Sequence, residues 1–307
     1  MPIVSVILPT FNRLKLLNEA LESLSNQTFK DFEVIVINDG GEIPKKVIEN
    51  WNNILDIKLI NSNINNGPGI ARNIGIEESQ GDFLAFLDDD DIFLPSHLEY
   101  GVKFLVKSNL DFIYTNMIMS SKRIKYPPKF FTKEYRIIGY KFVKDFLMIC
   151  CFFTLGTFIC RNFKNTSIRF SNLFTVCEDW ELQLKLCINE GFKGTNCKKI
   201  TTIYHRVPEK NSLCTNATIS FESNLKFVNA WRKIITNFST NNLLIKEYRN
   251  YMIRFHNRCI EHLKNNKELN LFYYEDFVNF LYTSFISEKN FLAPDLDEQI
   301  DKIILKT

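Results

Sequence analysis

Short apolar runs and helical patterns alternate along the first 120 residues. The apolar runs are rich in β-branched and aromatic residues, which favours buried strands; they cover residues 3–8, 32–37, 57–60, 83–87 and 112–119. Between them, apolar residues recur at helical spacing or a proline or glycine stands where a helix would begin, which predicts helices over 14–26, 44–51, 67–78 and 95–106. Strands that alternate with helices form βαβ units. We therefore expect a Rossmann-like, mostly parallel sheet flanked by helices.

The pattern changes after residue 120. The middle of the chain is less regular and predicts strands over 154–160 and 200–204 and a helix over 178–189. From about residue 218 onward the apolar residues keep helical spacing. We expect an α/β domain over 1–215 and a helical C-terminal subdomain over 216–307.

The composition is that of a globular protein. Of the 307 residues, 45% are hydrophobic and 24% are charged, which excludes a disordered chain. The 28 phenylalanines predict an aromatic-rich core. The net charge of +3 is small for a general nucleic-acid-binding protein. We therefore expect no nucleic-acid partner.

The cysteines and the N-terminus bear on the cellular compartment. None of the eight cysteines forms a Cys-x-x-Cys pair or stands near a histidine at zinc-finger spacing, so we expect buried thiols in a reducing compartment. The N-terminus lacks the basic region and cleavage site of a signal peptide. The most apolar run, 146–160, is shorter than the ~20 residues of a membrane span. We expect a cytoplasmic protein, either free or bound peripherally at the inner membrane face.

Four consecutive carboxylates, Asp88 to Asp91, directly follow the apolar run that ends at Leu87. Adjacent carboxylates repel one another, and a bound divalent cation removes that cost. Where a strand end turns, the first and third carboxylates can face the same ligand. Mg²⁺ and Mn²⁺ take oxygen ligands, and Mg²⁺ sites usually combine one or two carboxylates with substrate phosphates. The alternative is a solvated acidic turn that caps the helix near Pro95.

Three further polar clusters follow predicted strands or open predicted helices. The segment 66–73 is glycine-rich, but it follows the third strand and carries Arg72, unlike the dinucleotide fingerprint. Arg72 is thus either a nucleotide contact or part of a plain helix start. Glu178 and Asp179 open a predicted helix, where a carboxylate either favours the helix dipole or acts as a general base. His205 follows a predicted strand and is either structural or, beside a metal site, a ligand.

These motifs, in this order, resemble an inverting glycosyltransferase of family 2 with the GT-A fold. The resemblance covers about residues 2–215 and is carried by 4–13 (VSVILPTFNR), 36–41 (VINDGG), 66–75 (NGPGIARNIG), 86–91 (FLDDDD) and 178–180 (EDW). The chain departs from the common pattern at Asn38, where an acidic residue is frequent, and at Gly41, where serine is usual. The residues after 215 match no family that we can name.

The resemblance implies a nucleotide-binding half over about residues 1–120. Asp39 would accept a hydrogen bond from the base, and Arg72 would reach the nucleotide. The other nucleotide-binding residues would be Pro9, Thr10, Phe11, Asp88 and Asp89. UDP is the nucleotide that we expect.

The resemblance also implies a metal site, a catalytic base and an acceptor half over about residues 121–215. Asp90 would bind Mn²⁺ or Mg²⁺ on the donor diphosphate, together with Asp88. His205 stands slightly off the usual position of a late histidine and would be a further ligand. Asp179 would remove the proton from the acceptor hydroxyl, and a single displacement would invert the anomeric carbon. The neighbours of this base, Glu178 and Trp180, would lie on the acceptor side.

The implied reaction moves a sugar from a nucleotide-diphosphate sugar to a hydroxyl of a glycan or lipid-linked acceptor. We expect it to serve the assembly of bacterial envelope polysaccharide, lipopolysaccharide or glycoprotein glycans. Two alternatives stay open. A nucleotidyltransferase would share the sheet and the metal, but it usually has a basic glycine-rich loop where this chain has residues 9–13. A non-catalytic sugar- or partner-binding module would not need both Asp90 and Asp179.

The segment 122–144 holds eight lysines or arginines and one acidic residue. Aromatic residues are interleaved with these charges, among them Tyr126, Phe130, Phe131 and Tyr135. Basic charge with aromatic anchors suits a phosphate-bearing acceptor or an anionic membrane surface. Lys125, Lys129 and Lys133 would then be acceptor-side residues. The alternative is a solvated basic loop whose aromatic rings fold back into the core.

Overall fold

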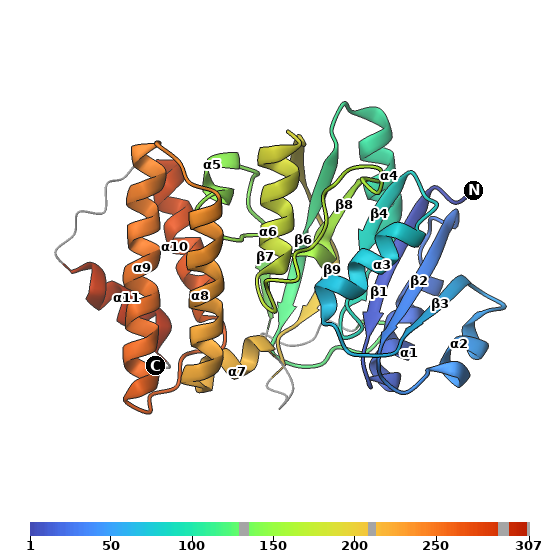
Figure 1. Ribbon diagram of the computed structural model, residues 1–307, viewed down its shortest axis with the longest axis horizontal. Helices are drawn as coiled ribbons and strands as arrows, with labels where there is room; N and C mark the ends of the chain where they lie inside the picture. Colours follow the sequence, from blue (N-terminus) through green and yellow to red (C-terminus); the bar gives the residue numbers. More distant parts are fainter. Residues whose placement is uncertain (129–134, 208–212, 288–294, 306–307) are drawn as a thin grey trace. The chain divides into compact units, whose positions relative to one another are not determined.

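The computed structural model describes residues 1–128, 135–207, 213–287 and 295–305 (Figure 1). The chain divides into two compact units. The first unit comprises Met1–Phe142 and Phe153–His205, and the second comprises Val143–Phe152 and Arg206–Thr307. The structure therefore groups residues 143–152 and 206–215 with the helical tail, whereas the sequence-based ranges placed them in the first domain.

The first unit is built on a mixed sheet, which has nine strands in the described part of the chain. The strands are β1 (Val4–Thr10), β2 (Phe32–Asp39), β3 (Asp56–Ser62), β4 (Phe83–Phe86), β5 (Ile92–Phe93), β6 (Phe112–Ser120), β7 (Tyr135–Ile138), β8 (Phe158–Arg161) and β9 (Gly194–His205). Their order is β3-β2-β1-β4-β8-β6-β9-β5, with β7 paired to β6. The pairings along β3-β2-β1-β4 and between β6 and β9 are parallel, and the others in the described part of the chain are antiparallel. This confirms the predicted mostly parallel sheet.

Helices cover both faces of this sheet. The helical segments of the first unit are α1 (Leu14–Ser25), α2 (Lys45–Trp51), α3 (Pro68–Glu78), α4 (His97–Lys107), the 3₁₀ turn η1 (Leu155–Thr157) and α6 (Glu178–Leu184), which continues as the π-helical segment η2 (Lys185–Asn189). Side chains alternate between the faces of a strand. Val6 of β1 accordingly packs in the core that also contains the apolar sides of α1, α2 and α4, whereas Ile7 points to α3.

The approach of α3 to the sheet depends on a glycine. A Cβ atom at Gly75 would lie 2.6 Å from Cγ2 of Ile7 and 3.0 Å from Cδ1 of Ile37. Because real Cβ atoms do not approach other carbons so closely, only glycine lets α3 pack at this distance. This close packing holds α3 against β1 and β2.

The parallel strands bring their carboxyl ends to one edge of the sheet. Thr10, at the end of β1, is paired with Asn38, and Ile7 of β1 is paired with Phe86 at the end of β4. The polar segments that follow β1, β2 and β4 are therefore neighbours in space. Ligands of open α/β sheets bind at this edge.

The second unit is helical. Its helices are α5 (Lys144–Leu147), α7 (Leu213–Ile219), α8 (Phe221–Asn237), α9 (Leu243–Lys264), α10 (Tyr273–Ser287) and α11 (Leu296–Ile304). Phe255 of α9 stacks on Phe277 of α10, with ring centroids 4.1 Å apart. Trp231 of α8 donates a hydrogen bond to the carbonyl of Ile149 (2.9 Å), and Arg249 of α9 donates to that of Met148. These bonds explain why residues 143–152 belong to this unit. Within the described ranges, no helix combines the length and the apolar character needed to cross a bilayer.

Candidate active site

The end of β2 holds the loop that leads into α3. Asp39 is 4% exposed, and its two carboxylate oxygens accept hydrogen bonds from the backbone N–H groups of Asn66 (3.0 Å) and Gly67 (2.8 Å). The loop also passes close to Gly40, where a Cβ atom would lie 2.5 Å from the carbonyl carbon of Ile64. Gly40 and Gly67 both have positive φ, of 77° and 86°, which glycine adopts at little cost. Asp39 therefore fixes a loop, and its contact with a nucleotide base stays a prediction.

The end of β1 lies against the acidic run. The Thr10 hydroxyl donates to Oδ2 of Asp89 (2.7 Å), and Nη1 of Arg13 donates to Oδ1 of the same carboxylate (3.1 Å). Phe11 is 42% exposed, so its ring lies free beside the strand end. Pro9, the residue before Thr10, is half-buried. These residues surround the edge where the sequence predicts the nucleotide.

The four aspartates separate into two pairs. Asp89 and Asp91 are 5% and 3% exposed and point into the protein, where Asp91 accepts a hydrogen bond from the backbone N–H of His205 (2.9 Å). The side chains of Asp88 and Asp90 are 38% and 31% exposed. Asp90 accepts a hydrogen bond from Nη1 of Arg13 (3.0 Å). The first and third carboxylates are thus the ones open to a ligand.

Burial and mutual repulsion disturb the protonation of this run. Burial and the neighbouring Asp90 charge raise the pKa of Asp89 to about 7, against the opposing effect of Arg13. Burial, followed by repulsion from Asp88, raises the pKa of Asp90. Burial and repulsion from Asp90 and Asp88 raise the pKa of Asp91 well above its usual range. The positive groups around these four carboxylates therefore do not fully compensate their negative charge.

A divalent cation suits this donor set. Within the described residues, no group of three or more His, Cys, Asp or Glu side chains is arranged to hold a metal by itself. Two partly exposed carboxylates, Asp88 and Asp90, are what a Mg²⁺-type site needs when substrate phosphates supply the other oxygens. The residues present therefore fit an ion that binds together with a diphosphate.

His205 is better explained as a structural residue than as the metal ligand considered from the sequence. Its Nε2 accepts a hydrogen bond from the backbone N–H of Ile124 (3.0 Å), so Nδ1 carries the proton and donates to the carbonyl of Asp90 (2.6 Å). Both ring nitrogens are therefore engaged with backbone groups. These bonds fix the backbone around Asp90, and the predicted coordination by His205 is corrected.

Arg72 joins the end of β4 to the start of α6. Its guanidinium is buried, and it donates from Nη2 to Oδ1 of Asp88 (2.5 Å) and from Nη1 to Oε1 of Glu178 (2.9 Å). The ring of Phe170 lies 5.6 Å from the guanidinium carbon. The sequence suggested a direct nucleotide contact for Arg72, but in the structure its terminal nitrogens bind two carboxylates. The bridge connects residues 106 positions apart in the chain.

Asp179 stands in the first turn of α6. One of its oxygens, Oδ1, accepts a hydrogen bond from the backbone N–H of Trp180 (2.8 Å). Burial, followed by repulsion from Glu178, raises the pKa of Asp179 to about 7, although Trp180 and Arg72 oppose the shift. A carboxylate with a pKa near the working pH is suited to general-base catalysis. Trp180 itself is 1% exposed, so it belongs to the core and not to the acceptor surface on which the sequence placed it.

The basic segment is only partly described. Lys125 is exposed, whereas Lys129 and Lys133, with Phe130 and Phe131, lie outside the described residues. Tyr126 and Tyr135 pack against a small core formed by Ile92, Ile118 and Ile203. The rings of these two tyrosines therefore fold back into the protein, as the solvated-loop alternative expects.

Sequence reasoning missed two arginines of the site. Arg13 binds both Asp89 and Asp90, and Arg123 donates to the carbonyl of Asp90 (2.8 Å). Arg13 is the last residue of the first motif, 4–13, and this position could have marked it as a residue of the site. Arg123 lies in the basic segment, where nothing in its spacing distinguishes it from its neighbours.

Curated relatives cover part of the chain. A glucosyltransferase of Campylobacter jejuni named for GalNAc(5)-diNAcBac-PP-undecaprenol is 45% identical over 101 residues, which is 32% of this chain and 33% of that protein. The Escherichia coli protein WfgD, named as a UDP-Glc:alpha-D-GlcNAc-diphosphoundecaprenol beta-1,3-glucosyltransferase, is 29% identical over 66% of this chain and 76% of its own length. The chain spans only 18–56% of the length of four uncharacterized glycosyltransferases that it also matches.

Solved structures share the fold along almost the whole chain. S. aureus TarS in complex with UDP-GlcNAc matches with a TM-score of 0.55 and 18% identity, over 98% of this chain and 91% of TarS 1–349. The Pyrobaculum calidifontis mannosyltransferase PcManGT, solved with GDP-Man and Mn²⁺, matches with a TM-score of 0.53 and 14% identity, over 94% of this chain and 74% of its own. At these identities the likeness shows the fold, and it confirms the predicted GT-A architecture. The model of the family "Glycosyl transferase family 2" matches residues 5–163, more than half of the chain. The chain therefore belongs to glycosyl transferase family 2.

Proposed function

We propose that the chain transfers a sugar from a UDP-sugar to a hydroxyl of a lipid-linked glycan, with inversion at the anomeric carbon. One observation carries the proposal. Arg72 joins Asp88, the partly exposed carboxylate at the donor edge, and Glu178, the neighbour of Asp179, in a single ion-paired group around its own buried guanidinium. The candidate base is thereby fixed next to the carboxylates that suit a metal-bound diphosphate.

The names of the relatives support the substrate classes. The relatives from Campylobacter jejuni and Escherichia coli are named for undecaprenol-diphosphate-linked glycans, and TarS has been solved with UDP and with UDP-GlcNAc. We infer a lipid-linked acceptor and a uridine nucleotide for this chain, and a place in the assembly of envelope polysaccharide or glycoprotein glycans.

The uridine would bind at the ends of β1 and β2. Phe11 offers an exposed ring that can stack on a base, next to Pro9 and Thr10. A carboxylate oxygen can accept more than one hydrogen bond. Asp39 can therefore keep its bonds to the loop at Asn66 and Gly67 and still accept the N3–H of uracil.

The chemistry of transfer is a single displacement. Asp179 takes the proton of the acceptor hydroxyl, whose oxygen attacks the anomeric carbon from the face opposite the diphosphate. The bond from that carbon to the diphosphate oxygen breaks, and UDP leaves with the electron pair. One displacement inverts the configuration.

The leaving diphosphate needs compensation for its growing charge. Asp88 and Asp90 would hold Mn²⁺ or Mg²⁺, which supplies Lewis-acid stabilisation of that charge when bound. Asp89 and Asp91 hold the backbone of the run through Thr10, Arg13 and the N–H of His205. The two open carboxylates are thus placed by the two buried ones.

Product analysis tests the proposal. The purified chain is incubated with radiolabelled UDP-sugars, Mn²⁺ and synthetic diphosphate lipids that carry one or two N-acetylhexosamines, and Asp179→Asn serves as the matched variant. We expect one UDP-sugar to extend the lipid-linked acceptor by one sugar with an anomeric configuration opposite to that of the donor, and the variant to give little product. Binding of the UDP-sugar with neither transfer nor hydrolysis would identify a non-catalytic module, and retained configuration would exclude the single displacement.

A further inference from the structure

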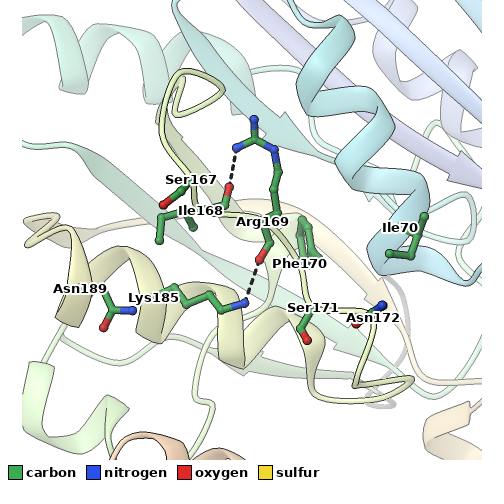
Figure 2. A pocket seen from close by; sticks show the side chains of 9 residues that line it. All are labelled: Ile70, Ser167, Ile168, Arg169, Phe170, Ser171, Asn172, Lys185 and Asn189. Carbon is green, nitrogen blue, oxygen red and sulfur yellow. Dashed lines mark hydrogen bonds between the residues drawn. The ribbon is translucent and has the colours of Figure 1, made fainter.

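An open pocket adjoins the base-bearing helix within the first unit (Figure 2). It is lined by the loop 167–172, by Ile70 of α3, by Lys185 and by Asn189. Its volume is about 410 Å³, within the ~300–1,000 Å³ typical of small-molecule sites. Its chemistry determines which part of a substrate it can take.

Arg169 is not available to bind a phosphate there. A guanidinium has five N–H donors. Nε and Nη2 donate to Glu77, the second N–H of Nη2 donates to the carbonyl of Lys164, and the two N–H groups of Nη1 donate to those of Thr166 and Ile168. All five donors are therefore used inside the protein, and the Glu77 carboxylate neutralises the charge.

Lys185 is largely committed as well. Its ammonium donates to the carbonyl of Arg169 (2.9 Å) and pairs with Oε1 of Glu181 (2.9 Å). Figure 2 shows the first of these bonds crossing from η2 to the loop 167–172. One N–H of the three remains for a ligand. The pocket therefore has two cations in its wall but little uncompensated charge.

The free polar groups of the pocket are uncharged. Within the described residues, the side chains of Ser167, Asn172 and Asn189 have no hydrogen-bonding partner in the protein, and the Ser171 hydroxyl accepts one bond from Leu173 N and retains its proton. Ile70, which is half-buried, adds apolar surface. Hydroxyl and amide groups beside an apolar wall match a neutral sugar ring, which has hydroxyls at its edge and C–H groups on its faces.

The pocket shares walls with the catalytic group. Phe170 lies under the Arg72 guanidinium, and a Cβ atom at Gly69, next to Ile70, would lie 3.3 Å from Cβ of Phe170 and 3.4 Å from Cγ of Glu178. Lys185 follows Asp179 by six positions. At a rise of 1.5 Å per residue this is roughly 9 Å along the helix. This axial rise and the contacts of Phe170 and Gly69 place the pocket beside the helix that carries Asp179, where a sugar ring bonded to the one that receives the donor can extend into it.

We propose that this pocket binds the second sugar of the acceptor, the ring next to the one that is glycosylated. The inference rests on the proposed function and adds to it the acceptor class: a glycan of at least two neutral sugars. A single sugar on diphosphate would place two negative charges in a pocket without free cations. The chain is thus suited to extend a glycan and not to start one.

The test compares two acceptors that carry the same diphosphate lipid, one with a single N-acetylhexosamine and one with a disaccharide. The double variant Asn172→Ala/Asn189→Ala removes the two amides, and Asn165→Ala, an exposed residue of the same segment outside the pocket, is the matched control. All three side chains are exposed, and thermal melting checks folding. We expect the wild type to have a lower KM for the disaccharide acceptor. Loss of two hydrogen bonds raises that KM by about tenfold in the double variant, while the KM for the single-sugar acceptor and donor hydrolysis are unchanged.

Each other outcome has a distinct meaning. Equal disaccharide KM values for the wild type, the double variant and the control would overturn the pocket's role, and so would a wild-type preference for the single-sugar acceptor. An equal rise of KM for both acceptors in the double variant would assign the amides to the diphosphate instead. This result would also overturn the pocket's proposed role. A wild type that neither hydrolyses nor transfers any UDP-sugar would overturn the proposed function itself.

Discussion

Replacing Arg72 by leucine should both destabilise the fold and change the pH dependence of transfer. The substitution leaves two carboxylates without their cation: Glu178, whose side chain is 12% exposed, and Asp88, whose side chain is 38% exposed. It also removes the positive charge that lowers the pKa of Asp179. The same change therefore has a structural and a catalytic consequence.

The structural cost follows from burial. Removing one partner of a buried ion pair costs about 3–5 kcal/mol, because the other charge stays buried and uncompensated. Here the Glu178 side of the bridge accounts for most of the loss, since Asp88 is partly solvated and its pairing is worth less. We expect the free energy of unfolding to fall by about 3 kcal/mol at pH 7.5.

Urea unfolding measures this loss against two companion variants. Arg72→Leu/Glu178→Gln lacks the stranded charge and should recover more than half of the loss. Arg161→Leu removes an exposed pair, 3.9 Å from Asp111, and should cost at most about 1 kcal/mol. A loss below 1 kcal/mol in Arg72→Leu would refute the view that this bridge is a buried ion-paired group.

The catalytic consequence is a displaced pH profile. The proposed base, Asp179, must be deprotonated to act, so we expect activity to rise as the pH passes the pKa of Asp179, about 7 in the wild type. Without Arg72 this pKa rises further, and the ascending limb of kcat against pH should move to higher pH. An unchanged limb would show that Asp179 does not sense the guanidinium.

Three other expectations follow. Asp179→Asn should bind UDP as the wild type does in calorimetry but lose ~10²–10⁴-fold in transfer; near-full turnover would exclude it as the base. Asp90→Ala should abolish Mn²⁺-dependent binding of the UDP-sugar, and a chelator should reversibly silence the wild type, so full activity in excess chelator would count against a metal at Asp88 and Asp90. His97 and His256 are buried, and burial lowers the pKa of each to about 3 from 6.5. Each histidine stays neutral in the folded protein, whereas in the unfolded chain it takes up a proton below pH 6.5. Each histidine therefore lowers the free energy of unfolding by about 2 kcal/mol at pH 5. His256→Leu should lessen this loss in acid unfolding curves, and an identical loss in the variant would contradict the assignment.

Local patterns predicted most of the longer helices and strands, because period-two and helical spacings reflect which faces a strand or helix buries. The short strands β5 and β7 were not predicted. The alternation of strands and helices also predicted that Thr10, Asp39 and Asp88 lie at one edge of the sheet, because parallel strands have their carboxyl ends at the same edge. The sequence did not predict which groups the charged side chains would pair with. Arg72 and Glu178 are 106 residues apart, and nothing in either segment indicates which oxygen the guanidinium will meet.

The errors have the same origin. The family resemblance placed Trp180, the neighbour of Asp179, on the acceptor side, yet α6 turns that position into the core. A histidine after a strand, beside a carboxylate run, suggested a ligand, yet backbone groups of Ile124 and Asp90 engage both ring nitrogens of His205. Residues 143–152 group with the helices because Trp231 and Arg249 bond to their carbonyls. Such pairings depend on the assembled fold and not on local spacing.

The tether between Asp39 and the loop at Asn66 and Gly67 has a thermodynamic consequence for the arrival of a nucleotide. Fixing a residue's backbone costs about 1–2 kcal/mol, and here that entropy is lost during folding and not during binding. A ligand that meets an already ordered loop keeps more of its contact energy as affinity, and loop closure does not slow its association. Asp39→Ala should therefore weaken nucleotide binding through an entropic penalty and a slower association rate, even where the ligand never touches the missing carboxylate.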